Sequence, residues 1–201
     1  MDALSQLEHD CGFTVPSSYR AFVDRGYTTY PGPAYLWVNE AEWIPTAAIS
    51  TYEWAGMPKP GLVPFAFSGG GDLWCWQTQS ITRAGEPPIA FCPHDSLQGE
   101  WHAPSFIGWL YRVGLEYATS IGDGEFETRR HIAKWALLVD EFGDAGWAAD
   151  LIAISHRPLS KYKEGRREYA GLIIPENVRE RVANAFGAEF VDAKYIWDRE
   201  G

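Results

Sequence analysis

The sequence predicts an α+β protein with a central, mainly antiparallel sheet flanked by helices, and an α/β C-terminal extension. Two aromatic runs, LVPFAF and DLWCWQT, flank a glycine-rich turn as the strands of an antiparallel hairpin do. Helical periodicity appears on both sides of these strands, without a regular strand–helix alternation. With 201 residues, 46% of them hydrophobic, the chain is long enough to bury a core.

Two short helices are expected at the start. The first covers residues 4–11 and ends at Gly12, whose freedom at positive φ suits a helix C-terminus. The second begins after Pro16 and ends at Gly26. Their apolar faces consist of Leu4, Leu7 and Cys11, and of Tyr19, Phe22 and Val23.

The next segment is expected to be turn-rich from Tyr27 to Pro33. A strand is predicted from Ala34 to Val38, and a short helix from Pro45 to Trp54. The hairpin then extends from Leu62 to Thr78. Its second strand carries apolar residues on both faces, which predicts a central strand covered on both sides. The alternating faces are Leu73, Cys75 and Gln77, and Trp74, Trp76 and Thr78.

A further strand is predicted from Ile89 to Cys92, followed by a polar loop. Pro104 opens a helix that is expected to pack on the sheet through one apolar stripe. That stripe consists of Phe106, Trp109, Leu110, Val113 and Tyr117. Two more helices follow the IGDGE connection, with inward residues Ile132, Trp135, Ala136 and Val139, and Trp147, Leu151 and Ile154. The last expected elements are a strand at 169–174, a helix at 175–186 and a strand at 189–196.

The formal charge of -10 argues against nucleic acid and anionic membranes as ligands, and it favours a basic partner. Twelve acidic and five basic side chains precede residue 119. We expect a cytoplasmic protein, because no apolar run is long enough to span a bilayer and the N-terminus does not resemble a leader. Three widely spaced cysteines, Cys11, Cys75 and Cys92, are expected to be reduced thiols.

Four motifs occur in a characteristic order: VPSSYRAF, VPFAFSGGGDLWCW, PPIAFCPHD and APSFIGWL. In this order the chain resembles the SUKH superfamily of bacterial toxin-immunity proteins and yeast cell-wall-assembly-regulator-like domains. The counterparts here are the turn Gly69, Gly70, Gly71 and Asp72, and the helix start at Ser105 and Phe106. The resemblance covers residues 1–118, a SUKH-like domain, whereas the extension at 119–201 has no counterpart in the family.

The resemblance implies an immunity protein that binds and neutralises a cognate toxin without catalysis of its own. A nuclease toxin would present a basic cleft that an acidic surface complements. The alternative is a regulatory or scaffold module, and an unrecognised hydrolase is less favoured. Candidate partner-binding residues are Trp37, Glu40, Glu42, Trp43, Glu53, Trp54, Glu100 and Trp101. Tryptophans beside carboxylates suit a contact with a basic protein, but packing at the margin of the core explains them equally well.

Catalytic, metal and cofactor sites are not predicted. The GGGD turn is interpreted as structural, since neither GK[ST] nor a helix follows it. His94, Asp95, Glu100 and His102 could bind a divalent metal, although a solvated loop is favoured. Other weak candidates lack a mechanistic context: Ser68, Ser105 and Cys75 as nucleophiles, Asp140 and Glu141 as paired carboxylates, and the basic run Lys161, Lys163, Arg166 and Arg167.

Overall fold

The structure of the chain is a computed structural model. It describes residues 2–52, 61–83, 85–96, 98–119, 125–143, 145–164, 167–172, 174, 178, 182, 186 and 194–196, with only the backbone at 98, 162–164, 167–169 and 194–196. The chain forms two compact units, residues 1–106 with 188–201, and residues 107–187. The domain boundary expected after residue 118 stays a prediction, because a compact unit is not thereby an independently folding domain.

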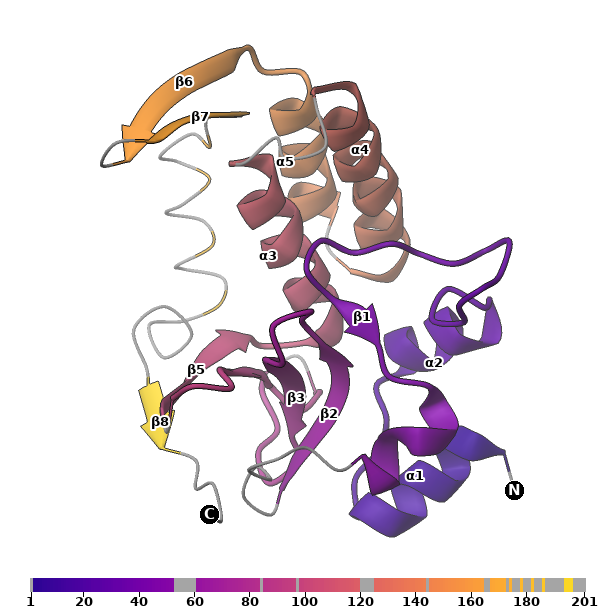
Figure 1. Cartoon of the computed structure of the whole chain (residues 1–201). Helices are drawn as coiled ribbons and strands as arrows, with labels where there is room; N and C mark the ends of the chain where they lie inside the picture. The colour runs from indigo at the N-terminus through magenta and orange to yellow at the C-terminus, as the bar shows by residue number, and fades with distance from the viewer. Residues whose placement is uncertain are drawn as a thin grey trace. The chain divides into compact units, whose positions relative to one another are not determined.

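The first unit contains a six-stranded sheet in the order β1-β2-β3-β4-β5-β8, with every neighbouring pair antiparallel (Figure 1). Its elements are α1 (Ala3–Cys11), α2 (Ser17–Asp24), β1 (Glu42–Trp43), the 3₁₀ helix η1 (Thr46–Thr51), β2 (Leu62–Phe67), β3 (Leu73–Gln77), β4 (Ile89–Cys92), β5 (Gln98–Ala103) and β8 (Lys194–Ile196). The antiparallel sheet and its helices confirm the predicted α+β class.

The first two helices are confirmed, although α2 ends at Asp24, two residues before the expected Gly26. The Asp2 carboxylate accepts a hydrogen bond of 2.8 Å from the backbone N–H of Ser5 and caps the start of α1. Gly12 ends α1 at φ 66°, a left-handed conformation that glycine adopts without steric cost. Helix α2 starts directly after Pro16, as the sequence predicts.

Strand β3 is central, and both of its faces are buried as expected. On one face, the ring of Tyr19 from α2 meets the ring of Trp76 edge-on, with centroids 4.8 Å apart. On the other face, Cys75 belongs to a fully buried cluster with Leu73, Ala90 and Cys92. Half-buried side chains surround this cluster: Tyr52, Leu62, Phe67 and Trp101. Apolar residues on two faces therefore identified the central strand correctly.

Two predictions about the first unit were wrong. Residues 34–38 do not form a strand, and only Val38 makes an isolated antiparallel bridge, to Ala41. The polar loop expected after Cys92 contains strand β5, which pairs with β4. Tertiary pairing overrides local propensity in both places, because a strand forms where a neighbour supplies its hydrogen bonds. The helix expected over residues 45–54 is the shorter η1, and residues 53 and 54 lie outside the described part.

The second unit contains a helical hairpin and a two-stranded sheet (Figure 1). Its elements are α3 (Phe106–Ala118, of which Ile107 onward belongs here), α4 (Glu125–Phe142), α5 (Ala145–Ser155), β6 (Leu159–Glu164) and β7 (Arg167–Leu172). Glycine at position 114 lets α3 pack closely against α5, because a Cβ at this position would lie 3.1 Å from the Leu151 side chain. The phenol of Tyr111 donates a buried hydrogen bond of 3.0 Å to Asp150.

The stripe predicted on α3 serves more than the sheet. Phe106 packs against Phe65 of β2, whereas Tyr117 contacts Trp135 of α4. Strand β6 was not predicted, and it pairs with β7, which begins two residues before the strand expected at 169–174. Within 175–186 only Val178, Val182 and Phe186 are described, and all three are helical. None of the described helices has the length and apolar character needed to cross a membrane.

Candidate functional site

The exposed edge of the sheet at β1 combines one carboxylate with four aromatic rings. Glu42 is exposed and lies opposite Phe67 of β2 in the ladder. The rings of Phe67 and Tyr52 stack at a centroid distance of 6.1 Å. Tyr35 meets Tyr30 edge-on at 5.1 Å, and Tyr30 is 78% exposed. We call these five residues, together with Glu40, the acidic–aromatic edge.

The charge of Glu42 acts on one tyrosine of each aromatic pair, Tyr35 and Tyr52. Partial burial raises the pKa of the Tyr35 phenol, and the nearby Glu42 carboxylate raises it further. The same two causes, in the same order, raise the pKa of Tyr52. Both phenols therefore stay protonated at neutral pH and remain hydrogen-bond donors beside a negative charge.

Glu40 is the described non-glycine residue with positive φ, at 56°. It lies in the tight turn that the Val38–Ala41 bridge closes, where Ala41 donates to the Val38 carbonyl at 3.2 Å. A left-handed conformation is costly for a residue with a Cβ, and such positions concentrate at functional sites. The turn holds Glu40 exposed, two residues before Glu42.

Those predicted partner-binding residues that the structure describes do not all lie together in the first unit. Trp43 is only 6% exposed and its Nε1–H donates to the Leu36 carbonyl at 2.8 Å, so it is a core residue and not a contact residue. Trp37 is half-buried. Glu53 and Trp54 lie outside the described residues.

Glu100 and Trp101 lie on β5, far from β1. Four strand spacings of about 4.8 Å separate these strands, or roughly 19 Å. Trp101 pairs with Ala90 and packs on the buried cluster, whereas Glu100 points to the opposite face of the sheet. Sequence analysis did not select the three tyrosines of this edge. Tyr30 lies in the segment predicted as turn-rich, Tyr35 in the predicted strand and Tyr52 in the predicted short helix.

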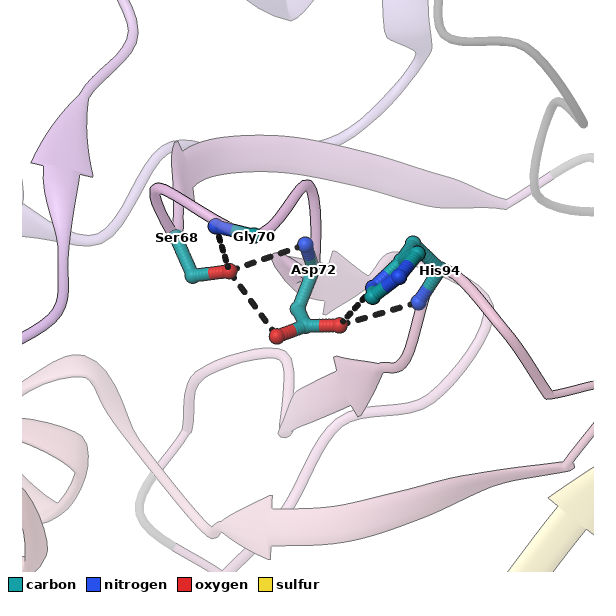
Figure 2. A network of polar contacts seen from close by, with 4 residues as sticks. All are labelled: Ser68, Gly70, Asp72 and His94. Atoms are coloured by element: carbon teal, nitrogen blue, oxygen red, sulfur yellow. Dashed lines mark hydrogen bonds and ion pairs between the residues drawn. The ribbon is translucent and has the colours of Figure 1, made fainter.

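A polar network fixes the turn between β2 and β3 (Figure 2). The Ser68 hydroxyl donates to one Asp72 oxygen at 2.8 Å and accepts from the backbone N–H groups of Gly70 and Asp72. The other Asp72 oxygen accepts from the His94 backbone at 3.0 Å and contacts the His94 ring at 2.8 Å. Partial burial works to raise the pKa of Asp72, but these hydrogen bonds outweigh it and leave the pKa below its ordinary value.

The same network has the residue types of a catalytic triad but a different arrangement. Asp72 lies between Ser68 and His94 (Figure 2), so the serine hydroxyl donates its hydrogen bond to the carboxylate and not to the imidazole. A nucleophilic serine needs a hydrogen bond from its hydroxyl to the base. The geometry therefore supports a turn that anchors the loop after β4.

The structure does not support the candidate metal ligands or the candidate thiol nucleophile. Within the described ranges, no group of three or more His, Cys, Asp or Glu side chains is placed to hold a metal ion. Cys75 and Cys92 are fully buried with their sulfur atoms 4.0 Å apart, and burial raises the pKa of Cys75 well above its ordinary value. A buried thiol of raised pKa is a poor nucleophile.

A half-buried carboxylate links the N-termini of two helices. Glu86 accepts a hydrogen bond of 3.0 Å from the Phe106 backbone N–H, and one of 3.4 Å from the Ser18 hydroxyl. Burial raises the pKa of Glu86, although both hydrogen bonds work against that rise. Sequence analysis did not select Glu86, because nothing in its local pattern indicates that two distant helices begin beside it.

Both helices that Glu86 joins carry motifs noted in the sequence, PSSYRAF on α2 and SF at α3. Neither a curated protein nor a solved structure matches the chain. A family model does match, over residues 2–112, which is more than half of the chain and contains β1 to β5 and the acidic–aromatic edge. On this match, the chain belongs to the SMI1/KNR4 family (SUKH-1).

Proposed function

We propose that this protein is an immunity protein, which neutralises a cognate toxin in the cytoplasm by binding it through the acidic–aromatic edge. The observation that carries the proposal is the placement of Glu42, an exposed carboxylate among tyrosine and phenylalanine rings at the edge of the family-matched sheet. Membership of the SUKH-1 family supports a role in binding proteins.

The chemistry of the edge suits a basic protein surface. Tyrosine contributes a large contact area and a hydroxyl at low entropic cost, and it is enriched among residues that dominate binding energy. Tyr30, Tyr35 and Tyr52 would cover apolar and aliphatic parts of the partner. Glu40 and Glu42 would pair with its arginine or lysine side chains in the partly desolvated interface.

The charge of the family-matched segment favours the same kind of partner. Residues 2–112 contain eleven acidic and five basic side chains. An excess of negative charge accelerates association with a basic partner and has less effect on dissociation. A nuclease, whose active site must attract phosphates, is the toxin class that this charge fits best.

Inhibition by binding requires no chemical step from this chain. The placement of Asp72 between Ser68 and His94 supports a structural role for this turn, because the serine hydroxyl is bonded to the carboxylate and not to the imidazole. Toxin inhibition would then follow from occlusion and would be stoichiometric.

The test is co-expression with the C-terminal domain of the toxin encoded beside the gene, scoring cell survival and co-purification. We expect survival and a one-to-one complex with the natural chain. Glu42→Arg and Tyr35→Ala should each abolish protection, whereas Asp95→Lys, a charge change at an exposed loop residue, should leave it intact. Protection that survives both edge variants would refute the edge as the binding surface.

A complex without protection would instead indicate a regulatory or scaffold role. If the natural chain gives no complex and no protection, the immunity proposal is refuted. Association kinetics add a second readout. The association rate should fall as the ionic strength rises from about 0.01 to about 0.15 M, because the Debye length then shrinks from about 30 to about 8 Å.

A further inference from the structure

Helix α4 carries an apolar stripe on the side that faces away from its own core. Phe126 is 75% exposed and Leu137 is 67% exposed, and the small side chain of Ala133 lies between them. Positions 126, 133 and 137 fall on one face of a helix. The opposite face already packs in the unit through buried residues such as Ile132 and Trp135. The exposed stripe is therefore a second apolar face.

Helix α5 extends this surface and makes it concave. Ile152 is 43% exposed and lies with Phe126, Ala133 and Leu137 around a groove of about 500 Å³. The remaining lining residues are Arg129, Arg130, Ser155 and His156. A contiguous exposed apolar surface of this kind usually marks an interaction site.

Opposite charges flank the Ala133–Leu137 part of the stripe. Arg130 is one helical turn after Phe126, and Asp140 is one turn after Leu137. The side chain of Arg130 is 62% exposed, and its ion pair with Glu127 is an exposed contact between neighbouring turns. Exposed pairs of this kind contribute little, so Arg130 can exchange that partner for another carboxylate.

We propose that α4 is a self-association surface, on which a second copy of this chain docks α4 against α4 in antiparallel orientation about a two-fold axis. One alignment of the two helices places a small side chain opposite a large one and opposite charges together. When Ala133 faces Leu137 of the second copy, Arg130 faces Asp140 of the second copy, because both pairs have the same midpoint in the helix. The two-fold axis repeats each contact.

This complementarity favours a second copy over an unrelated helix. A small residue opposite a large one lets the helices approach, and Leu137 of each copy can enter the groove of the other. An unrelated partner would need an acidic group, an apolar stripe and a basic group at these same spacings, and α4 itself supplies all three. The proposal does not depend on toxin binding, which concerns the other unit.

The first test is sedimentation of the full chain between about 1 and about 200 μM, the range for weak self-association. We expect a monomer–dimer equilibrium that Leu137→Ser shifts to monomer. Ile81→Ser removes an apolar side chain of similar exposure, 66%, from the first unit, and it should leave the equilibrium unchanged. Circular dichroism and thermal unfolding confirm that each variant is folded.

The second test exchanges the charges. Arg130→Glu and Asp140→Arg should each weaken dimerisation about tenfold or more, since each places like charges together at two symmetric positions. The double variant should restore the affinity to within a few-fold of the natural chain. A monomer at the highest concentration would overturn the proposal. So would a dimer that is insensitive to Leu137→Ser, or a charge-reversed double variant as weak as the singles.

Discussion

Two substitutions of Glu86, the carboxylate between the starts of α2 and α3, should separate its hydrogen bond to Phe106 from the effect of its charge on stability. Glu86→Ala leaves the Phe106 N–H without its acceptor at the start of a helix, in a residue that is fully buried. An unsatisfied buried N–H costs about 1–3 kcal/mol, and we expect a loss of unfolding free energy of that size. Glu86→Gln keeps an oxygen that can accept the same hydrogen bond, and should cost less than about 1 kcal/mol at pH 7.

The pH dependence has a defined sign. Burial raises the pKa of Glu86 in the folded state, so the carboxyl of the unfolded chain loses its proton at lower pH than that of the folded chain. The stabilisation by the protonated form is complete below the unfolded pKa, and it is lost as pH rises through the folded pKa. The stability of the natural chain relative to Glu86→Gln should therefore fall as pH rises from about 4 to about 7.

The assay is urea unfolding followed by tryptophan fluorescence at several pH values, with Glu42→Ala as a matched exposed control. The control should change the unfolding free energy by no more than about 0.5 kcal/mol. A Glu86→Ala variant as stable as the natural chain would show that Phe106 finds another acceptor. If the unfolding free energy of the natural chain, relative to that of Glu86→Gln, instead increases as pH rises from about 4 to about 7, the raised pKa of Glu86 is refuted.

Three further predictions concern the first unit. Asp72→Ala should cost about 1–2 kcal/mol at pH 7, and this difference should shrink as pH falls through the lowered pKa of Asp72, which denaturant titrations at pH 7 and about 3 can measure. Trp43→Phe should lower stability by about 1 kcal/mol through the lost hydrogen bond and leave partner affinity unchanged, in unfolding and binding assays on one preparation. Under native conditions a thiol reagent should modify only Cys11, and slowly, because burial raises its pKa; mass spectrometry should find Cys75 and Cys92 modified only after unfolding.

Sequence periodicity was sufficient where one segment determines its own structure. The helices α1 and α2 follow from apolar stripes, the first ended by Gly12 and the second opened after Pro16, and β3 follows from apolar residues on both faces. It failed for β5, whose sequence QGEWHA has polar side chains at every second position and one large apolar residue, and which is a strand between β4 and β8. The same holds for β6, a charged segment that pairs with β7.

The candidate site was predicted in residue type but only partly in position. The expectation of aromatic side chains beside carboxylates describes the acidic–aromatic edge, and Glu40 and Glu42 are in both sets. The tryptophans differ, because a large indole with one hydrogen bond is readily buried, as Trp43 is against the Leu36 carbonyl. Tyr35 and Tyr52 approach Glu42, and Tyr30 approaches Tyr35, only after folding, so no spacing in the sequence marks these tyrosines.

The shortness of β1 has a consequence for how any partner can dock at this edge. An edge strand of two residues, followed directly by Ile44 and the proline at position 45, offers almost no free backbone for another strand to extend the sheet. Recognition there must use side chains and not backbone pairing. If a partner docks there, substitutions in the acidic–aromatic edge would change which protein is bound and leave the hydrogen bonds of the sheet unchanged, so that the fold and the binding specificity can vary separately.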